Sequence, residues 1–267
     1  MSVNANGVSN NEMLLIDVDA GICKITLNRP AQYNALSVEF LTALQNALDE
    51  IAENKTIRVV IIAANGKAFC AGHDLKEMRS SEDREFHQSL FTQCGRMMQT
   101  INQLPQPVIA QVSGIATAAG CQLVATCDLA VAADNARFAV SGINVGLFCS
   151  TPAVPLSRNM HRKQAMHMLL TGEFIDAITA RQYGLINEIV PVDQLESATL
   201  ELARKITGKS PLAIEMGKKF FYQQLNLDLS AAYGIASETM ACNMDSEDAR
   251  EGIDAFVEKR QPEWKGR

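Results

Sequence analysis

Two short turns of small residues have the composition to bind a negatively charged oxygen. Ala-Gly-His-Asp (71–74) and Thr-Ala-Ala-Gly-Cys (117–121) each come after a run typical of a buried strand, and each opens a helical stretch. The first N–H groups of a helix have no partner inside it, and the helix dipole favours negative charge there. Two such turns on adjacent parallel strands could direct two N–H donors at one carbonyl oxygen, as an oxyanion or enolate requires. The alternative is that these turns serve packing alone.

The segments around the turns predict alternating strands and helices. Strands are expected at 14–19 and 22–28, which form a hairpin, and at 59–65, 108–112 and 128–134, which are mostly apolar, as buried parallel strands are. Helices are expected at 38–54, 74–78, 121–127, 161–172, 179–185, 193–208, 211–225 and 247–260. Ser37, Asp74 and Asp193 are the predicted N-caps, and residues 76–88 a mobile surface segment. Two strand–turn–helix units of the same plan indicate an α/β protein with a parallel sheet.

Length and charge limit the classes of function. The chain has 267 residues, 47% of them hydrophobic, and a net charge of −6. It can therefore bury a full core, and it has no overall attraction to nucleic acid or to an anionic membrane. Residues 1–11 are expected to be flexible, and residues 12–267 to form a single domain. The start of the chain lacks the basic and apolar regions of a signal peptide, and no apolar window is long enough for membrane insertion, so a cytoplasmic protein is expected.

The cysteines do not predict a metal site or a disulfide framework. There are seven of them, scattered, without a C-x-x-C pair or a Cys/His cluster of zinc spacing. No G-x-G-x-x-G follows a strand either, so a Rossmann dehydrogenase is not supported.

Five ordered motifs resemble the enoyl-CoA hydratase/isomerase (crotonase) superfamily. They are A-F-C-A-G-H-D-L-K-E-M, I-A-T-A-A-G-C-Q-L-V-A-T-C-D, L-L-T-G-E-F-I-D-A, Y-G-L-I-N-E-I-V and E-G-I-D-A-F-V-E-K-R. The resemblance runs from about residue 12 to the C-terminus. It implies a ClpP/crotonase-like fold of repeated ββα units (12–200) and a C-terminal helical region (201–267) that forms a homotrimer, or a hexamer of two trimers. It also implies an acyl-CoA ligand, with coenzyme A entering as part of the substrate thioester and no tightly bound cofactor.

The resemblance assigns the oxyanion hole to two backbone N–H groups, those of His73 and Ala119. The family usually has glycine where Ala119 stands. Alanine keeps the N–H, although its methyl group could alter how the acyl chain enters.

The positions of the family's acid and base do not hold carboxylates. Hydratases of the family use two glutamates, and the matching positions here are Gln122 and Gly142, neither of which exchanges protons. A third position, aspartate in some isomerases, matches Ser150. A general acid or base typically contributes about 10² to 10⁴ in rate, so the usual water addition is in doubt. His73 and Cys149 are nearby titratable residues that could replace the missing carboxylates. The alternative for His73 is that its side chain points away from the ligand, and the alternative for Cys149 is that its thiol is buried and inert.

Six residues match the family's contacts with coenzyme A. Backbone groups of Ala71 and Leu75 would meet pantetheine and adenine, Arg29 and Lys76 would lie near the phosphates, and Phe256 and Lys259 would reach the ligand of a neighbouring subunit. Two hypotheses follow. In the first, the protein is a lyase or isomerase that stabilises a thioester enolate. In the second, it is a catalytically impaired protein that binds acyl-CoA or regulates its use.

Overall fold

The structure, a computed structural model, describes residues 2–3, 9–10 and 12–267. Its largest sheet has six strands. Its strand order is β12-β9-β7-β5-β4-β3. The strands are β3 (Leu14–Asp19), β4 (Ile22–Leu27), β5 (Val59–Ala64), β7 (Val108–Val112), β9 (Leu129–Ala133) and β12 (Glu188–Val190). All neighbours pair in parallel except the β3–β4 hairpin. The α/β prediction with a parallel sheet is therefore confirmed.

A second sheet of four short strands was not predicted. Its order is β11-β10-β8-β6, with β6 (Ala68–Cys70), β8 (Ile115–Thr117), β10 (Arg137–Ala139) and β11 (Ile175–Asp176). Each of β5, β7 and β9 is followed by one of these short strands and then by a helix or a 3-10 turn. This repeat is the ββα unit that the resemblance implied, and it places the ends of β6, β8 and β10 next to one another.

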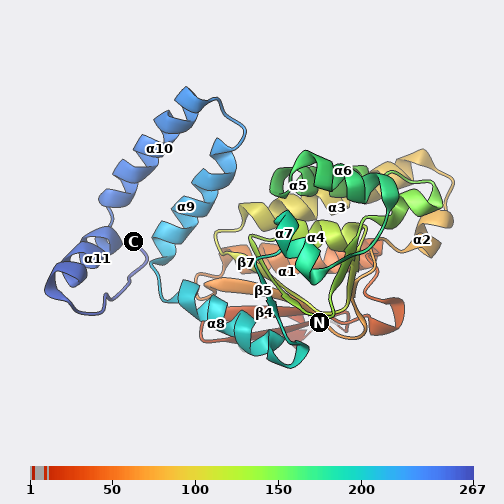
Figure 1. The fold of residues 1–267 in the computed structure, drawn as a ribbon. Coiled ribbons are helices and arrows are strands. Elements are labelled where there is room, and N and C mark those ends of the chain that lie inside the picture. The colour runs from red at the N-terminus through yellow and green to blue at the C-terminus, as the bar shows by residue number, and fades with distance from the viewer. Residues whose placement is uncertain (1, 4–8, 11) are drawn as a thin grey trace.

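Helices cover both faces of the large sheet (Figure 1). On one face lie α1 (Val38–Glu53), α3 (Arg84–Gln103), α4 (Ala119–Thr126), α5 (Ser150–Asn159), α6 (Arg162–Thr171) and α7 (Ala177–Tyr183), over the larger apolar cluster. The opposite face is covered by α8 (Leu195–Thr207), whose Leu195 and Ala203 pack on Val59, Ile61 and Ile109. The 3-10 turns are η1 (Pro30–Gln32), η2 (Ser141–Val145) and η3 (Val192–Gln194).

Three local predictions can be compared with the structure. Ser37 and Asp74 cap their helices, because their side chains accept the N–H groups of Phe40 and of Lys76 and Glu77. Asp193 does not cap α8. It lies inside η3, which runs directly into the helix, and no side chain caps that helix.

The segment 76–88, predicted to be mobile, is largely helical. It contains part of α2 (Leu75–Arg79) and the start of α3, which Asp83 caps by accepting the N–H of Glu85. The helix was not predicted because its first turn is charged in sequence, and its buried apolar positions begin only at Leu90 and Cys94.

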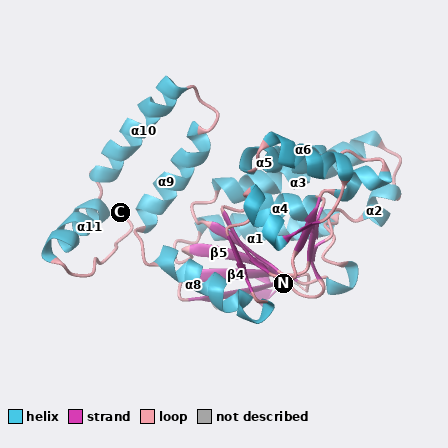
Figure 2. Cartoon of the chain, in the orientation of Figure 1, coloured by secondary structure: helices cyan, strands magenta, loops and turns pink. Residues whose placement is uncertain are grey.

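The C-terminal helices extend away from the sheets (Figures 1 and 2). They are α9 (Pro211–Gln224), α10 (Leu229–Met244) and α11 (Glu247–Glu258), and neither α9 nor α10 has a fully buried residue. The predicted boundary at residue 200 falls within α8, and the division of the domain there stays a prediction. Most of segment 1–11, which was predicted to be flexible, lies outside the described residues. Its described parts, Ser2–Val3 and Ser9–Asn10, pair as antiparallel strands.

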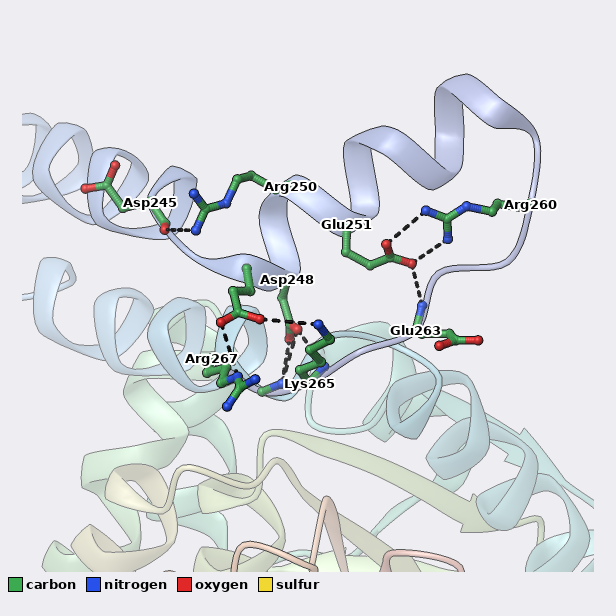
Figure 3. A network of polar contacts seen from close by, with 10 residues as sticks. Asp245, Asp248, Arg250, Glu251, Arg260, Glu263, Lys265 and Arg267 are labelled. Atoms are coloured by element: carbon green, nitrogen blue, oxygen red, sulfur yellow. Dashed lines mark hydrogen bonds and ion pairs between the residues drawn. The ribbon is translucent and has the colours of Figure 1, made fainter.

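The chain after α11 folds back along that helix (Figure 3). Arg260 forms an ion pair with Glu251, whose carboxylate also accepts the N–H of Glu263. The buried carboxylate of Asp248 accepts the N–H groups of Lys265 and Gly266. These bonds hold the last residues of the chain against α11.

Candidate functional site

A cavity of about 320 Å³ lies where the two predicted turns meet the first turns of α4 and α5. Most of its lining is apolar. The lining residues are Ala71, His73, Leu75, Met78, Phe91, Ala118, Ala119, Ser141, Gly142, Val145, Leu147, Phe148, Cys149, Ser150, Thr151 and Pro152. The structure therefore brings together the predicted residues Ala71, His73, Leu75, Ala119, Gly142 and Ser150.

The two turns lie side by side because β6 and β8 are paired in parallel. Gly72 has φ +94°, and a Cβ at this position would lie 2.8 Å from the Ala118 Cβ and 3.2 Å from the Ala119 nitrogen. A side chain at residue 72 would thus push the turns apart, which explains glycine there.

Among the described residues, the N–H groups of His73 and Ala119 have no hydrogen-bond partner. His73 forms a parallel bridge with Leu36, in which the Gly72 carbonyl and the Asp74 N–H make the bonds to Leu36. In such a bridge, the N–H of the middle residue points to the opposite side. Ala119 is the first residue of α4, and its N-cap, Ala118, provides no side-chain hydrogen bond. The first N–H groups of α4 are therefore without a cap.

Ala118 holds a strained backbone conformation. Its φ of 50° and ψ of −120° are unusual for a residue with a Cβ. Such strain costs on the order of 1–3 kcal/mol and persists where the surrounding structure enforces it. Here the bond from the Ala118 N–H to the Ala139 carbonyl, at 3.0 Å, holds the turn in place.

The three positions of the expected acid and base are occupied differently. Gln122 is 3% exposed and does not line the cavity, and its Oε1 has no hydrogen-bond partner among the described residues. Gly142 lines the cavity, but a Cβ there would lie 2.7 Å from both the Cys149 Sγ and the Leu147 carbonyl oxygen. The Ser150 hydroxyl donates to the Phe148 carbonyl at 3.3 Å. None of the three provides a group that exchanges protons near neutral pH.

Cys149 fills the space that a side chain at residue 142 would need. Its Sγ accepts the Gly142 N–H at 3.3 Å. Burial raises the pKa of the Cys149 thiol, and the Gly142 N–H opposes this effect only in part. A thiol that stays protonated at neutral pH is a poor nucleophile and a poor base.

The imidazole of His73 packs edge-on against Phe91, with ring centroids 5.3 Å apart. Its two ring nitrogens are shielded from solvent and have no hydrogen-bond partner in the described part of the chain. Burial lowers the pKa of His73. The nearby backbone of Leu36 has a smaller, opposite effect on this pKa, although it does not form a hydrogen bond of normal geometry with the ring. The ring is therefore neutral at pH 7, and it is the backbone of His73 that has a free donor.

The family model described as Enoyl-CoA hydratase/isomerase matches residues 17–267. The chain belongs to this family. The mouse mitochondrial enoyl-CoA hydratase domain-containing protein 3 is 48% identical over 244 residues, 91% of this chain and 81% of the relative. The 2,3-dehydroadipyl-CoA hydratase of Escherichia coli K12 is 35% identical over 255 residues, 95% of this chain and 99% of the relative.

Solved structures of the family have the same fold. An enoyl-CoA hydratase of Mycobacterium smegmatis superposes with a TM-score of 0.94 and 55% identity, over 95% of this chain and 99% of that one. The human enoyl coenzyme A hydratase domain-containing protein 3 gives a TM-score of 0.92 and 45% identity, over 94% and 100%. The predicted crotonase-like fold is confirmed.

The relatives correct the expected location. The proteins from mouse, rat and human that match at 46–48% identity are all named mitochondrial. The prediction of a cytoplasmic protein, drawn from the first residues and from the lack of a long apolar window, is wrong. Within the described residues, no helix is long and apolar enough to cross a membrane, and no group of three or more His, Cys, Asp or Glu side chains could hold a metal ion.

The other residues matched to coenzyme A lie outside the cavity lining. Arg29 uses Nη1 to bind the Ala35 carbonyl and the Ser37 hydroxyl. Lys76 is exposed on α2, one residue after Leu75 in the lining. Phe256, 85% exposed, belongs to α11, and Lys259 is its C-cap. This helix lies apart from α2, α4 and α5, whose residues line the cavity (Figure 1).

Sequence reasoning missed the apolar lining of the cavity. Met78 and Phe91 come from α2 and α3. Val145 is the last residue of η2, and Leu147 and Phe148 lie between η2 and α5. The one signal in the sequence is V-G-L-F at 145–148, three large apolar residues around a glycine in a segment that no helix or strand pattern includes.

Proposed function

We propose that this protein is an enzyme that acts on acyl-CoA thioesters and stabilises the thioester enolate with the N–H groups of His73 and Ala119. One observation carries the proposal: at one apolar cavity, two adjacent small-residue turns present backbone donors that have no partner within residues 12–267. The hydratase names of the relatives agree with a thioester ligand.

In this mechanism, the thioester oxygen accepts both N–H groups. Negative charge gathers on that oxygen when a proton leaves Cα or a nucleophile adds at Cβ. Each donor of this kind contributes about 3 to 4 kcal/mol in well-studied enzymes. The first turns of α4 and α5 both line the cavity and neither has a side-chain cap, so their dipoles favour the same charge.

Proton transfer is the step for which the cavity has no evident group. No Asp, Glu, Lys or Arg is part of its lining, as far as the described residues show. The Cys149 thiol is protonated, and the ring nitrogens of His73 are shielded. Addition of water by a pair of glutamates is therefore not the proposed reaction. The proposed reaction is a lyase or isomerase step that proceeds through the stabilised enolate, with a proton carrier that the lining residues do not identify.

The coenzyme A moiety would lie along Ala71, Leu75 and Lys76. The exposed ammonium of Lys76 suits a phosphate group. Because Phe256 and Lys259 are far from this chain's own cavity, we propose that they act in a homotrimer or hexamer, at the site of a neighbouring copy.

The same lining favours a second candidate, a protein that binds acyl-CoA without turnover. A screen of acyl-CoA substrates with product identification, run beside binding titrations, distinguishes the two. Binding with turnover supports the enzyme, and binding without turnover of any substrate supports the second candidate. Absence of binding would refute both.

The oxyanion hole is tested by Gly72→Ala. The new Cβ, 2.8 Å from the Ala118 Cβ, separates the two turns, so we expect kcat/KM to fall about 10²- to 10³-fold, the usual effect of losing one donor. Gly66→Ala is a matched control, because Gly66 has φ +98° and its Cβ would lie 2.7 Å from the Pro30 Cβ, outside the cavity lining. Equal losses of activity in both variants would show that strain alone, and not the oxyanion hole, is responsible.

Placing glutamates at both positions is not expected to produce hydratase activity. In the double variant Gln122→Glu/Gly142→Glu, the side chain at 142 collides with the Leu147 carbonyl and the Cys149 thiol. Turnover of a short 2-enoyl-CoA, followed by loss of the enoyl absorbance, should therefore stay within about twofold of the parent, since the geometry needed for acid–base catalysis is absent. A gain of a hundredfold would mean that the segment 142–149 adapts and that the missing carboxylates alone limit the reaction.

A further inference from the structure

The direction of the His73 donor is set by a residue outside the cavity lining. The His73 N–H and the Gly72 carbonyl belong to one planar trans peptide unit, so they point in opposite directions. That carbonyl accepts the N–H of the buried Leu36 at 2.7 Å. The His73 N–H is therefore directed away from Leu36, and the position of Leu36 decides where this donor points.

Leu36 ends a segment of unusual backbone, residues 29–36, here called the support loop. Tyr33 and Asn34 have φ of 52° and 54°. Two left-handed residues in succession, neither of them glycine, persist where surrounding contacts enforce them. The support loop also binds the turn a second time, because the Tyr33 carbonyl accepts the Ala71 N–H at 3.0 Å.

The side chain of Asn34 joins the support loop to the turn between β5 and β6. It is fully buried, and its Oδ1 accepts the Arg29 N–H at 2.7 Å, which closes the loop on itself. Its Nδ2 donates to the carbonyls of Asn65 and Ala68, both at 2.9 Å, and these two residues flank the turn. Each N–H of the amide and its oxygen thus has a partner that only this orientation of the amide can satisfy.

We propose that Asn34 is a positioning residue for the oxyanion hole. Its amide fixes the support loop against the start of β6, the loop holds the Gly72 carbonyl through Leu36, and the His73 N–H is thereby aimed at the thioester oxygen. Asn34 is not part of the cavity lining, so it acts through the loop and touches no ligand. This inference rests on the proposed function, because it concerns the donor assigned there.

The test compares Asn34→Asp with a matched control, Gln106→Glu. Each change puts a carboxylate in place of a buried amide whose NH₂ group donates to two backbone carbonyls. Gln106 is 6% exposed, and its Nε2 lies 3.0 Å and 3.4 Å from the carbonyl oxygens of Ile51 and Asn54, outside the cavity lining. Both variants should be less stable than the parent in urea, because each loses the same kind of bonds.

The two variants should differ at the ligand. The measurement is the infrared stretching frequency of the thioester carbonyl in butyryl-CoA, isotope-labelled at that carbonyl, which hydrogen bonds from the protein lower on binding. Asn34→Asp should lose about half of this shift, because one of the two donors is misdirected, and Gln106→Glu should keep it.

Kinetics give a second measurement. In Asn34→Asp, the affinity for butyryl-CoA should fall by no more than about tenfold, the value of one neutral hydrogen bond. On any acyl-CoA that the parent turns over, kcat should fall about 10²- to 10³-fold, because the lost donor acts mainly on the enolate.

The outcomes separate this inference from the proposed function. If butyryl-CoA does not bind, or binds without a carbonyl shift in the parent, both are refuted. If the parent shows the shift and Asn34→Asp keeps it, or Gln106→Glu loses as much, the positioning role is overturned and the oxyanion hole stands. If Asn34→Asp does not fold, Asn34→Gly takes its place with the same outcomes, since glycine keeps the left-handed backbone without the amide.

Discussion

Replacing Gly120 with alanine is expected to lower the free energy of unfolding by about 3 kcal/mol or more. A Cβ at Gly120 would lie 2.1 Å from the Cys70 carbonyl oxygen and 2.8 Å from the Cys70 Cβ. The obstacle is the backbone at the end of β6, which cannot turn aside as a flexible side chain could. To relieve the overlap, α4 must move away from β6, and the Ala119 N–H moves with it. Urea unfolding measures the loss of stability, and acyl-CoA titration measures the loss of the site.

The matched control is Gly95→Ala in α3. A Cβ there meets nothing within 4 Å, so only the helix propensity changes, and the protein should become more stable by about 0.5 to 1 kcal/mol. Glycine to alanine is thus expected to lower the free energy of unfolding in α4 and to raise it in α3. If Gly120→Ala is tolerated as well as Gly95→Ala, then α4 does not pack as closely on β6 as the structure shows, and the placement of the Ala119 donor is in doubt.

The long elements of this fold are readable from sequence because each has a repeating pattern. The apolar positions of α1 recur at helical spacing after Ser37, β5 is apolar throughout, and β7 is apolar except for Gln111. The second sheet is not readable in this way. Its strands are two or three residues long, too short for any period to show, and they form because the neighbouring long strands hold them together.

The site also has a part that the sequence predicts and a part that depends on packing. The turns that contain His73 and Ala119 follow from strand–turn–helix order and from the family resemblance, and the structure brings them together at one cavity. The apolar side chains of Val145, Leu147 and Phe148 in the lining follow from neither, because their positions depend on how the chain from η2 to α5 folds back on Gly142. The position of Gln122 also depends on packing: a residue on the first turns of α4 can face the cavity or the interior, and this one is buried outside the lining.

Lys218→Met is expected to lower the free energy of unfolding by about 3 to 5 kcal/mol, the usual cost of removing one partner of a buried ion pair. The side chain of Lys218 is 7% exposed, and its Nζ lies 2.7 Å from the Asp128 carboxylate. It also donates to the carbonyls of Ile101 and Gln106, both at 2.9 Å. Methionine fills much of the same space, but it leaves the Asp128 carboxylate buried without a cation. Urea unfolding of Lys219→Met, the exposed neighbour on the same helix, provides the control and should change little.

The position of this ion pair gives it a further effect. Lys218 is on α9, which has no fully buried residue, whereas Asp128 lies between the end of α4 and the first residue of β9. Burial lowers the pKa of Lys218, and Asp128 raises it again, so the pair must form for the charged lysine to be tolerated there. The Tyr222 hydroxyl, one turn further along α9, donates to the same carboxylate at 2.7 Å. Without Lys218, hydrogen exchange should therefore accelerate in α9–α11 more than in β5 or β7, because these polar bonds attach the C-terminal helices to the sheet. Equal protection of α9–α11 in Lys218→Met and Lys219→Met would contradict this role.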